Sequence, residues 1–281
     1  MSEQSANTRP HFLKSIQGVD VPSLGFGTFR LEGMTCQRSV TCALGLGYRH
    51  IDTARVYGNE EAVGDGIRES DVDRESIFLT SKVWRDDLRP AKLKEEAEAS
   101  LRALGTDFLD LFLIHWPNPE IPLEDSIEAM EELRESGKIR HLGVSNFPPA
   151  WLERALRCGP VFCNQIEYHP LLAQDRVLDV ARAHDVLVTA YSPLAQGEVI
   201  GYPDLDEIAR RRGKTSEQVA LRWLIEQDHV AAIPRSSKLE HIEANFKVFD
   251  FSLNEEEKAA IAALPKDRRQ INPDFAPDWD A

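Results

Sequence analysis

The chain has 281 residues, of which 42% are hydrophobic and 28% are charged. This composition is typical of a globular protein with enough apolar material for a core, and the length suits either one α/β barrel of roughly 250 residues or two smaller domains. The net charge of -14, from 33 basic and 47 acidic residues, argues against nucleic acid or an anionic membrane surface as a partner.

The first 15 residues contain no apolar run that would serve as a signal peptide, and no segment approaches the ~20 apolar residues of a membrane span. The four cysteines form no C-x-x-C pair and have no histidine at ligand spacing, which favours free thiols over a disulfide or a zinc site. We therefore expect a cytoplasmic protein without a metal.

Strand-like and helix-like segments alternate along the chain. A hairpin around Gly18 is predicted over residues 11–21, and amphipathic segments such as residues 91–105 and 126–138 repeat apolar residues three and four apart, as helices do. Eight strands are predicted at residues 22–28, 50–54, 77–83, 109–115, 139–146, 162–169, 186–192 and 231–236. This alternation predicts right-handed β–α–β units and a parallel sheet.

The near-continuous apolar run at residues 109–114 indicates a strand covered on both faces, as a closed barrel requires. Helix starts are marked by Thr215 with Gln218, a capping-box pattern, and by Asn254. We predict an α/β fold with a single (β/α)8 TIM barrel domain over residues 1–281, an N-terminal β-hairpin and a C-terminal tail over the barrel mouth. A doubly wound open sheet is the alternative, which is disfavoured because GFGTFR lacks the third glycine of a dinucleotide-binding fingerprint.

Four ionisable residues coincide with the ends of consecutive predicted strands. Asp52 belongs to the second strand, Lys82 to the third and His115 to the fourth, and Tyr57 lies in the loop after the second. Active sites of (β/α)8 barrels lie at the carboxyl ends of the strands, so these side chains are expected at one rim. Each alone would more often be a cap, a solvated charge or a packing residue, but their coincidence favours a catalytic site.

This combination suits the delivery of a proton to a carbonyl oxygen. Free tyrosine titrates near pH ~10, and an ammonium group at Lys82 is expected to lower the pKa of Tyr57. Asp52 would keep that lysine charged, and His115 would orient the carbonyl or share the proton. Because no Ser or Cys nucleophile with a base stands beside them, the electrons must come from elsewhere, and a nicotinamide is the natural candidate.

The stretch GYRHIDTARVYGNEEAVG, residues 47–64, resembles the first signature of the aldo-keto reductase family almost residue for residue. SKVW, HWP and LGVSNF, at the third, fourth and fifth predicted strands, match other landmarks of that family. The resemblance runs from about Pro22 to the C-terminus. It implies that the catalytic tetrad consists of Asp52, Tyr57, Lys82 and His115, with Tyr57 as the acid.

The resemblance also implies a binding site for a nicotinamide cofactor. The implied contacts are Ser145, Asn146 and Gln165 with the carboxamide, Tyr191 stacked on the ring, and Ser192 and Leu194 along the pyrophosphate. The segment after the eighth strand reads IPRSSKLEHIEAN. It departs from the family pattern at three positions.

Arg235 replaces the usual lysine of that segment, His241 the usual arginine and Ala244 the usual glutamate, whereas Ser236 and Asn245 are retained. Arginine can hold a 2′-phosphate bidentately, so we expect NADPH to be preferred. Histidine is only partly charged near neutral pH. The preference is therefore expected to be weaker than usual for the family, with NADH also accepted.

Short loops after the fourth and seventh strands and the ending KDRRQINPDFAPDWDA look most like those of bacterial members that reduce methylglyoxal and diketo-gluconate. This likeness implies a shallow, open pocket for small aldehydes, keto-aldehydes or diketo-sugar acids. Candidate walls are Phe26, Phe29, Trp84 and Trp116, of which Phe26 is equally compatible with packing at the barrel mouth. A monomer is expected.

Two other classes of function stay open. The fold also serves in channel-associated β subunits that bind cofactor and turn over poorly, so a redox-sensing module is the main alternative. A turnover assay would distinguish this module from a reductase. A metal-dependent barrel hydrolase is disfavoured, because the strand ends do not offer the several His and Asp ligands that such a site needs.

Overall fold

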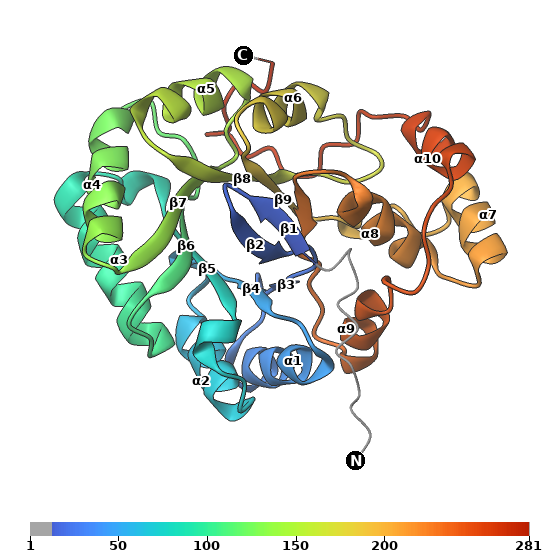
Figure 1. The fold of residues 1–281 in the computed structure, drawn as a ribbon, viewed down its shortest axis with the longest axis horizontal. Helices are drawn as coiled ribbons and strands as arrows, with labels where there is room; N and C mark the ends of the chain where they lie inside the picture. Colours follow the sequence, from blue (N-terminus) through green and yellow to red (C-terminus); the bar gives the residue numbers. More distant parts are fainter. Residues whose placement is uncertain (1–12, 281) are drawn as a thin grey trace.

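A computed structural model describes residues 13–280 and shows a barrel of parallel strands surrounded by helices (Figure 1). The barrel strands are β3 (Phe26–Gly27), β4 (His50–Asp52), β5 (Phe78–Val83), β6 (Leu109–Ile114), β7 (Ile139–Ser145), β8 (Val161–Glu167), β9 (Leu187–Tyr191) and β10 (Val230–Ala232). They lie in chain order, each hydrogen-bonded to the next. All eight predicted strands are confirmed, although β3 and β10 are much shorter than the apolar runs that predict them.

The barrel closes between its first and last strands. Leu24 and Ala232 form a parallel bridge, the backbone N–H of Gly25 donates to Ala232 O at 2.8 Å, and that of Gly27 donates to Pro234 O at 3.0 Å. An open sheet would leave both of its edge strands unpaired, so the doubly wound alternative is wrong.

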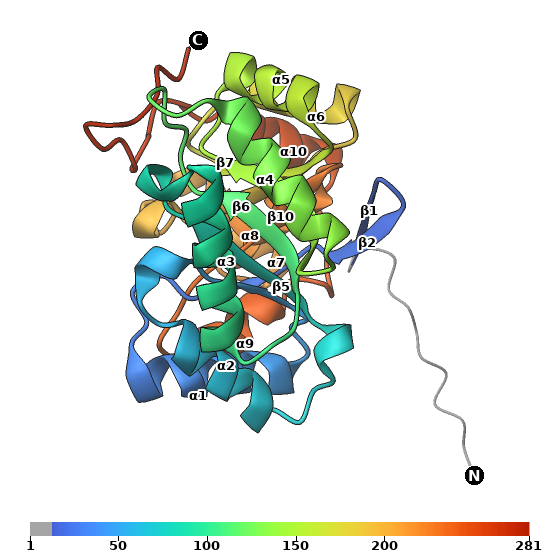
Figure 2. The same ribbon diagram turned by 90° about the vertical axis from the view of Figure 1, so that its left-hand side faces the viewer.

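Helices cover the outside of the barrel (Figure 1, Figure 2). Within residues 13–280 they are α1 (Gly33–Leu46), α2 (Glu60–Glu69), α3 (Pro90–Leu104), α4 (Leu123–Glu135), α5 (Pro149–Cys158), α6 (Asp175–Ala183), α7 (Pro203–Arg212), α8 (Ser216–Glu226), α9 (Leu239–Phe246) and α10 (Glu255–Ala262). The predicted caps are confirmed: capping boxes begin α8 at Thr215 and α10 at Asn254. None of these described helices combines the length and apolar character needed to cross a membrane.

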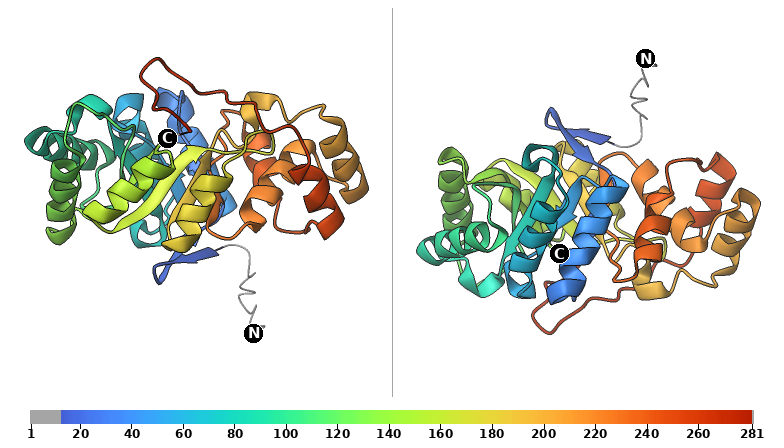
Figure 3. Two further views of the ribbon diagram at one scale, coloured as in Figure 1. Left: turned by 90° about the horizontal axis from the view of Figure 1, so that it is seen from above. Right: turned by 90° about the horizontal axis from the view of Figure 1, so that it is seen from below.

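The N-terminal hairpin closes one end of the barrel. Its strands β1 (Leu13–Ile16) and β2 (Val19–Pro22) pair antiparallel, which confirms the predicted hairpin from residue 13 onward, whereas residues 11 and 12 lie outside the described part. Ile16 and Val21 are buried against apolar residues of the barrel interior, among them Phe162. The hairpin and the C-terminal segment lie at opposite ends of the barrel (Figure 3).

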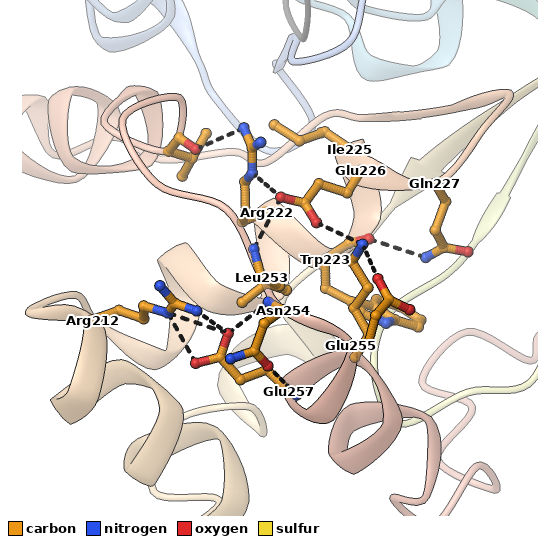
Figure 4. Close-up of polar contacts among 12 residues, drawn as sticks. Arg212, Arg222, Trp223, Ile225, Glu226, Gln227, Leu253, Asn254, Glu255 and Glu257 are labelled. Carbon is orange, nitrogen blue, oxygen red and sulfur yellow. Dashed lines mark hydrogen bonds and ion pairs between the residues drawn. The ribbon is translucent and has the colours of Figure 1, made fainter.

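A buried ion pair fixes α8 to the chain that leads into α10 (Figure 4). Arg222, 1% exposed, donates from Nε to Glu226 Oε1 at 2.6 Å, and the same oxygen accepts the backbone N–H of Leu253 at 3.1 Å. Arg212 of α7 pairs with Glu257 of α10 at 2.6 Å. Removing one partner of a buried pair leaves an uncompensated charge and costs about 3–5 kcal/mol. The first pair lies within α8, and its Glu226 joins that helix to the chain before α10 through the hydrogen bond from Leu253.

Candidate active site

A cavity of about 710 Å³ lies at the carboxyl ends of the barrel strands. Its volume falls within the range of about 300–1,000 Å³ that is usual for small-molecule sites. The predicted site residues that line it are Phe29, Asp52, Tyr57, Trp84, His115, Trp116, Asn146, Gln165, Tyr191, Ser192, Leu194, Arg235 and His241. The structure therefore brings the predicted catalytic and cofactor residues to one cavity.

Other predicted residues do not line this cavity. Lys82 and Ser145 are buried and bond to residues that line it. Ser236 and Asn245 are also buried. Ser236 lies just before α9, and Asn245 lies within that helix, which also carries His241. These four can act on the cavity only through their neighbours or after a local movement.

The prediction that Phe26 forms a wall of the substrate pocket is wrong. It is 1% exposed and its ring packs edge-on against Tyr48, with centroids 6.1 Å apart. Phe26 pairs with Ile51, and Gly27 pairs with Asp52. Because successive side chains of a strand point to opposite faces, Asp52 points into the barrel whereas Phe26 points outward to the helices.

Lys82 and Asp52 form a buried ion pair under the cavity. Lys82 is fully buried, and its Nζ donates to Asp52 Oδ1 at 2.6 Å and to the backbone oxygen of Thr53 at 2.8 Å. The third contact of Nζ is the Tyr57 hydroxyl at 3.5 Å. The second carboxylate oxygen of Asp52 accepts from Gln165 Nε2 at 2.7 Å. Each charge is therefore compensated by at least two partners, as burial requires.

Tyr57 ends a single 3₁₀ turn, η1 (Arg55–Tyr57), directly after β4. The turn stops at Gly58, whose φ of 66° is a left-handed conformation that glycine adopts without strain. The Tyr57 ring packs against the ring of Phe29, with centroids 5.0 Å apart, and edge-on against that of His115, with centroids 5.7 Å apart. The short turn thus places the phenol beside the histidine that follows β6.

Burial, with a smaller contribution from Asp52, raises the pKa of Tyr57 well above its usual range. The predicted lowering of this pKa is wrong in its net direction, because burial dominates the shift, although Lys82 Nζ lies 3.5 Å from the hydroxyl. Burial also lowers the pKa of Lys82, an effect that Asp52 opposes. Tyr57 is therefore a protonated phenol at neutral pH, with a hydrogen available for donation.

His115 is neutral at pH 7. Burial lowers its pKa well below the usual range, and the charge of Lys82 acts in the same direction. A neutral imidazole has one N–H donor and one acceptor nitrogen. Its ring packs edge-on against Trp84 at 5.3 Å, so it presents a polar group within an otherwise aromatic wall.

A hydrogen-bonded network at the ends of β7, β8 and β9 forms the middle of the cavity. Ser145 Oγ donates to Gln165 O at 2.8 Å, and Asn146 Nδ2 donates to His115 O at 3.0 Å. The Tyr191 hydroxyl donates to Asn146 Oδ1 at 2.7 Å. These bonds fix the amide side chains before any ligand binds, although they also occupy part of their hydrogen-bonding capacity.

Basic side chains also line the cavity, together with one carboxylate, Glu217. Arg30 and Arg235 line it together with His241, and the loop after β9 contributes Ser192 and Gln196 with left-handed backbone. The amide side chains of Asn146 and Gln165 and these basic side chains form a donor set that fits an anionic dinucleotide. The residues present are thus compatible with a nicotinamide dinucleotide.

The C-terminal segment contributes walls whose residues were not predicted individually, although the tail over the barrel mouth was. Ile271 lines the cavity. The ring of Phe275 packs edge-on against Trp84 at 5.6 Å and Trp116 at 5.4 Å, and Trp279 packs against Trp116 at 5.9 Å. The aromatic residues of the ending were the available signal, but nothing in their spacing indicates which residues they contact.

Glu167, at the end of β8, anchors this segment. Its buried carboxylate accepts the backbone N–H groups of Gln270 at 2.7 Å and Ile271 at 2.9 Å. His169 lies 3.0 Å from the same carboxylate. Hydrogen bonds to an ionised acceptor are among the stronger ones in proteins, so the segment is fixed where it crosses the barrel mouth.

The part of the chain that the structure describes contains no group of three or more His, Cys, Asp or Glu side chains placed to hold a metal ion. Its four cysteines, Cys36, Cys42, Cys158 and Cys163, are all free thiols.

Known proteins resemble this chain over most of its length. A sequence model of the Aldo/keto reductase family matches residues 23–201 and 198–266. A glyoxal reductase of Bacillus subtilis (strain 168) is 42% identical over 266 residues, which cover 93% of this chain and 96% of the relative. A methylglyoxal reductase DkgB of Escherichia coli O157:H7 is 39% identical over 266 residues, which cover 92% and 99%.

A solved structure of a candidate 2,5-diketo-D-gluconic acid reductase B superposes with a TM-score of 0.94 at 44% sequence identity, covering 96% of this chain and 98% of the other. Fold, sequence and family model agree over the segments that carry the cavity, which confirms the resemblance predicted from the sequence. This chain belongs to the aldo/keto reductase family and is an oxidoreductase that reduces carbonyl groups.

Proposed function

We propose that this protein reduces small aldehydes, keto-aldehydes or diketo-sugar acids with NADPH, and that Tyr57 donates the proton to the carbonyl oxygen. The observation that carries the proposal is the position of Tyr57 and His115 side by side at the cavity, above the buried Lys82–Asp52 pair. The names of the two bacterial relatives, glyoxal reductase and methylglyoxal reductase, support small aldehydes and keto-aldehydes as the substrate class.

A nicotinamide, when bound, would supply the hydride. The protein's own residues orient the carbonyl oxygen and protonate it. His115, as a neutral imidazole, donates a hydrogen bond that orients this oxygen. Tyr57 gives its proton to the oxygen as negative charge develops there. The resulting phenolate lies 3.5 Å from Lys82 Nζ, so the ammonium stabilises it, and Asp52 keeps that ammonium charged.

Cofactor binding is assigned to residues from the end of β7 to α9. In this proposal Ser145, Asn146 and Gln165 hold the carboxamide, Tyr191 stacks on the ring, Ser192 and Leu194 line the pyrophosphate, and Arg235, Ser236, His241 and Asn245 surround the 2′-phosphate. The substrate contacts Phe29, Trp84 and Trp116. A fork-shaped Arg235 favours NADPH, whereas the titratable His241 leaves room for NADH. A single domain, a monomer and a cytoplasmic location are part of the same proposal.

Oxidation of NADPH and NADH in the presence of methylglyoxal, nitrobenzaldehyde, a diketo-sugar acid and a steroid ketone tests this function. We expect turnover of the small carbonyl compounds, faster with NADPH, and little with the steroid. Tight cofactor binding without turnover of any carbonyl compound would contradict the proposal and favour the alternative, a redox-sensing module of the same fold.

A further inference from the structure

A turn of four residues, 28–31, joins β3 to the approach of α1 and forms the cavity wall beside Tyr57. The backbone N–H of Leu31 donates to Thr28 O at 3.0 Å. Phe29 is 50% exposed, and its ring contacts that of Tyr57 with centroids 5.0 Å apart. Since packing covers only half of Phe29, its position depends on what holds the backbone of the turn.

Two side chains from distant parts of the chain hold all four carbonyls of this turn. Asn59, which is buried, donates from Nδ2 to Thr28 O at 2.8 Å and to Leu31 O at 2.9 Å. The two remaining carbonyls accept from Arg235: Nε donates to Phe29 O at 3.0 Å, and Nη2 donates to Arg30 O at 3.3 Å. One side chain holds the turn from the interior and the other from the cavity.

The geometry of the guanidinium group leaves Arg235 with a second usable edge. Nε and Nη2 form one edge of the planar group, and both are directed at the turn. On the edge formed by Nη1 and Nη2, Nη1 has no hydrogen-bond partner among residues 13–280, Nη2 has a second hydrogen besides the one given to Arg30 O, and Arg235 lines the cavity. A guanidinium can engage two bidentate partners, whereas a lysine has a single nitrogen that cannot span both carbonyls and an anion.

We propose that Arg235 is a positioning residue for the substrate wall as well as a cation for the cofactor. Its Nε–Nη2 edge holds residues 28–31 against Tyr57, and its Nη1–Nη2 edge is left for the 2′-phosphate. Only this second role rests on the proposed function. The substrate wall is consequently in place without a 2′-phosphate, and NADH should meet the same wall as NADPH.

Hydrogen–deuterium exchange of the protein without cofactor tests the first role. Arg235→Lys keeps the positive charge but cannot reach both carbonyls, so peptides covering residues 26–34 should exchange faster than in the unmodified protein. Lys238→Ala is the matched control, because it removes a nearby positive charge from a residue that does not contact the turn. We expect its exchange in residues 26–34 to be unchanged.

Steady-state kinetics with NADH gives the second readout, since NADH has no 2′-phosphate through which Arg235 could act. The KM for nitrobenzaldehyde should rise about two- to tenfold in Arg235→Lys, as the loss of an ordinary, solvent-exposed hydrogen bond implies, with a smaller change in kcat. Unchanged exchange in Arg235→Lys with a loss confined to NADPH affinity would overturn the proposal, as would equal acceleration in Lys238→Ala. If the unmodified protein reduces no carbonyl compound, the proposed function fails, and the exchange comparison still decides the positioning role.

Discussion

At the scale of single residues, His241 stands where the family resemblance predicts an arginine. His241 lies in the first turn of α9 and lines the cavity, as Arg235 does from the segment before that helix. An imidazolium attracts a phosphate dianion, and histidine is the side-chain type whose charge changes near physiological pH. NADH has no 2′-phosphate and is insensitive to this change. The preference for NADPH should therefore decrease with rising pH.

Dissociation constants for NADPH and NADH from about pH 6 to pH 9 measure the effect. The ratio of the two constants should change about two- to fivefold, as expected for a partly exposed ion pair. His241→Arg should tighten NADPH binding and remove most of the pH dependence, because arginine stays charged. A ratio that does not depend on pH in the unmodified protein would show that His241 does not contact the phosphate.

At the scale of elements, the segment after α10 packs against Trp84 and Trp116 of the proposed substrate wall. Phe275 is held edge-on between Trp84 and Trp116, and pairs of this kind contribute about 0.5–1.5 kcal/mol each. Phe275→Ala should raise the KM for nitrobenzaldehyde several-fold, whereas the KM for methylglyoxal, which is too small to span the wall, should change little. Leu13→Ala on the hairpin, also an exposed apolar residue but at the opposite end of the barrel, is the control. Equal effects on both substrates would contradict the assignment.

The alternation of apolar runs and amphipathic segments predicts the barrel because neighbours in the chain are also neighbours in the sheet. Asp52 and His115 could be assigned to one rim for the same reason. The direction of Phe26 could not be predicted, since a barrel strand is covered on both faces and apolar residues do not distinguish inside from outside. The contact of Phe275 with Trp84 joins distant parts of the chain in a segment without periodicity, so no sequence pattern indicates it.

The bonds from Arg235 to the turn at residues 28–31 could not be predicted either. Their acceptors are backbone carbonyls, which every residue carries, so the sequence contains no signal for them. The pKa of Tyr57 was predicted in the wrong direction for a related reason: the extent of burial, which dominates its shift, is a property of the folded protein.

At the scale of the whole molecule, buried histidines should make the fold sensitive to acid. Burial lowers the pKa of His50, His115 and His141, whereas in the unfolded chain each titrates near ~6.5. Below this pH the unfolded state binds protons that the folded state does not. The free energy of unfolding should therefore fall as the pH falls, by about 1.4 kcal/mol per pH unit for each histidine that stays neutral in the fold.

Urea unfolding of the unmodified protein and of His50→Asn between pH 8 and pH 5 measures this contribution. His50 Nδ1 lies 3.3 Å from Pro22 O, and the amide of asparagine can make the same hydrogen bond without titrating. The slope of stability against pH below ~6.5 should be smaller in the variant by about 1 kcal/mol per pH unit. Identical slopes would mean that His50 does not contribute to the acid sensitivity.

The role of Tyr57 as proton donor is tested most directly by Tyr57→Phe, which removes one oxygen and leaves the ring in contact with Phe29 and His115. Turnover of methylglyoxal with saturating NADPH should fall about 10²- to 10⁴-fold, while the dissociation constant of NADPH stays nearly unchanged, because the lost interaction exists mainly in the transition state. Tyr168→Phe, which removes a hydroxyl bonded to Gln227 outside the cavity, should keep near-normal turnover. Near-normal turnover by Tyr57→Phe would contradict the mechanism.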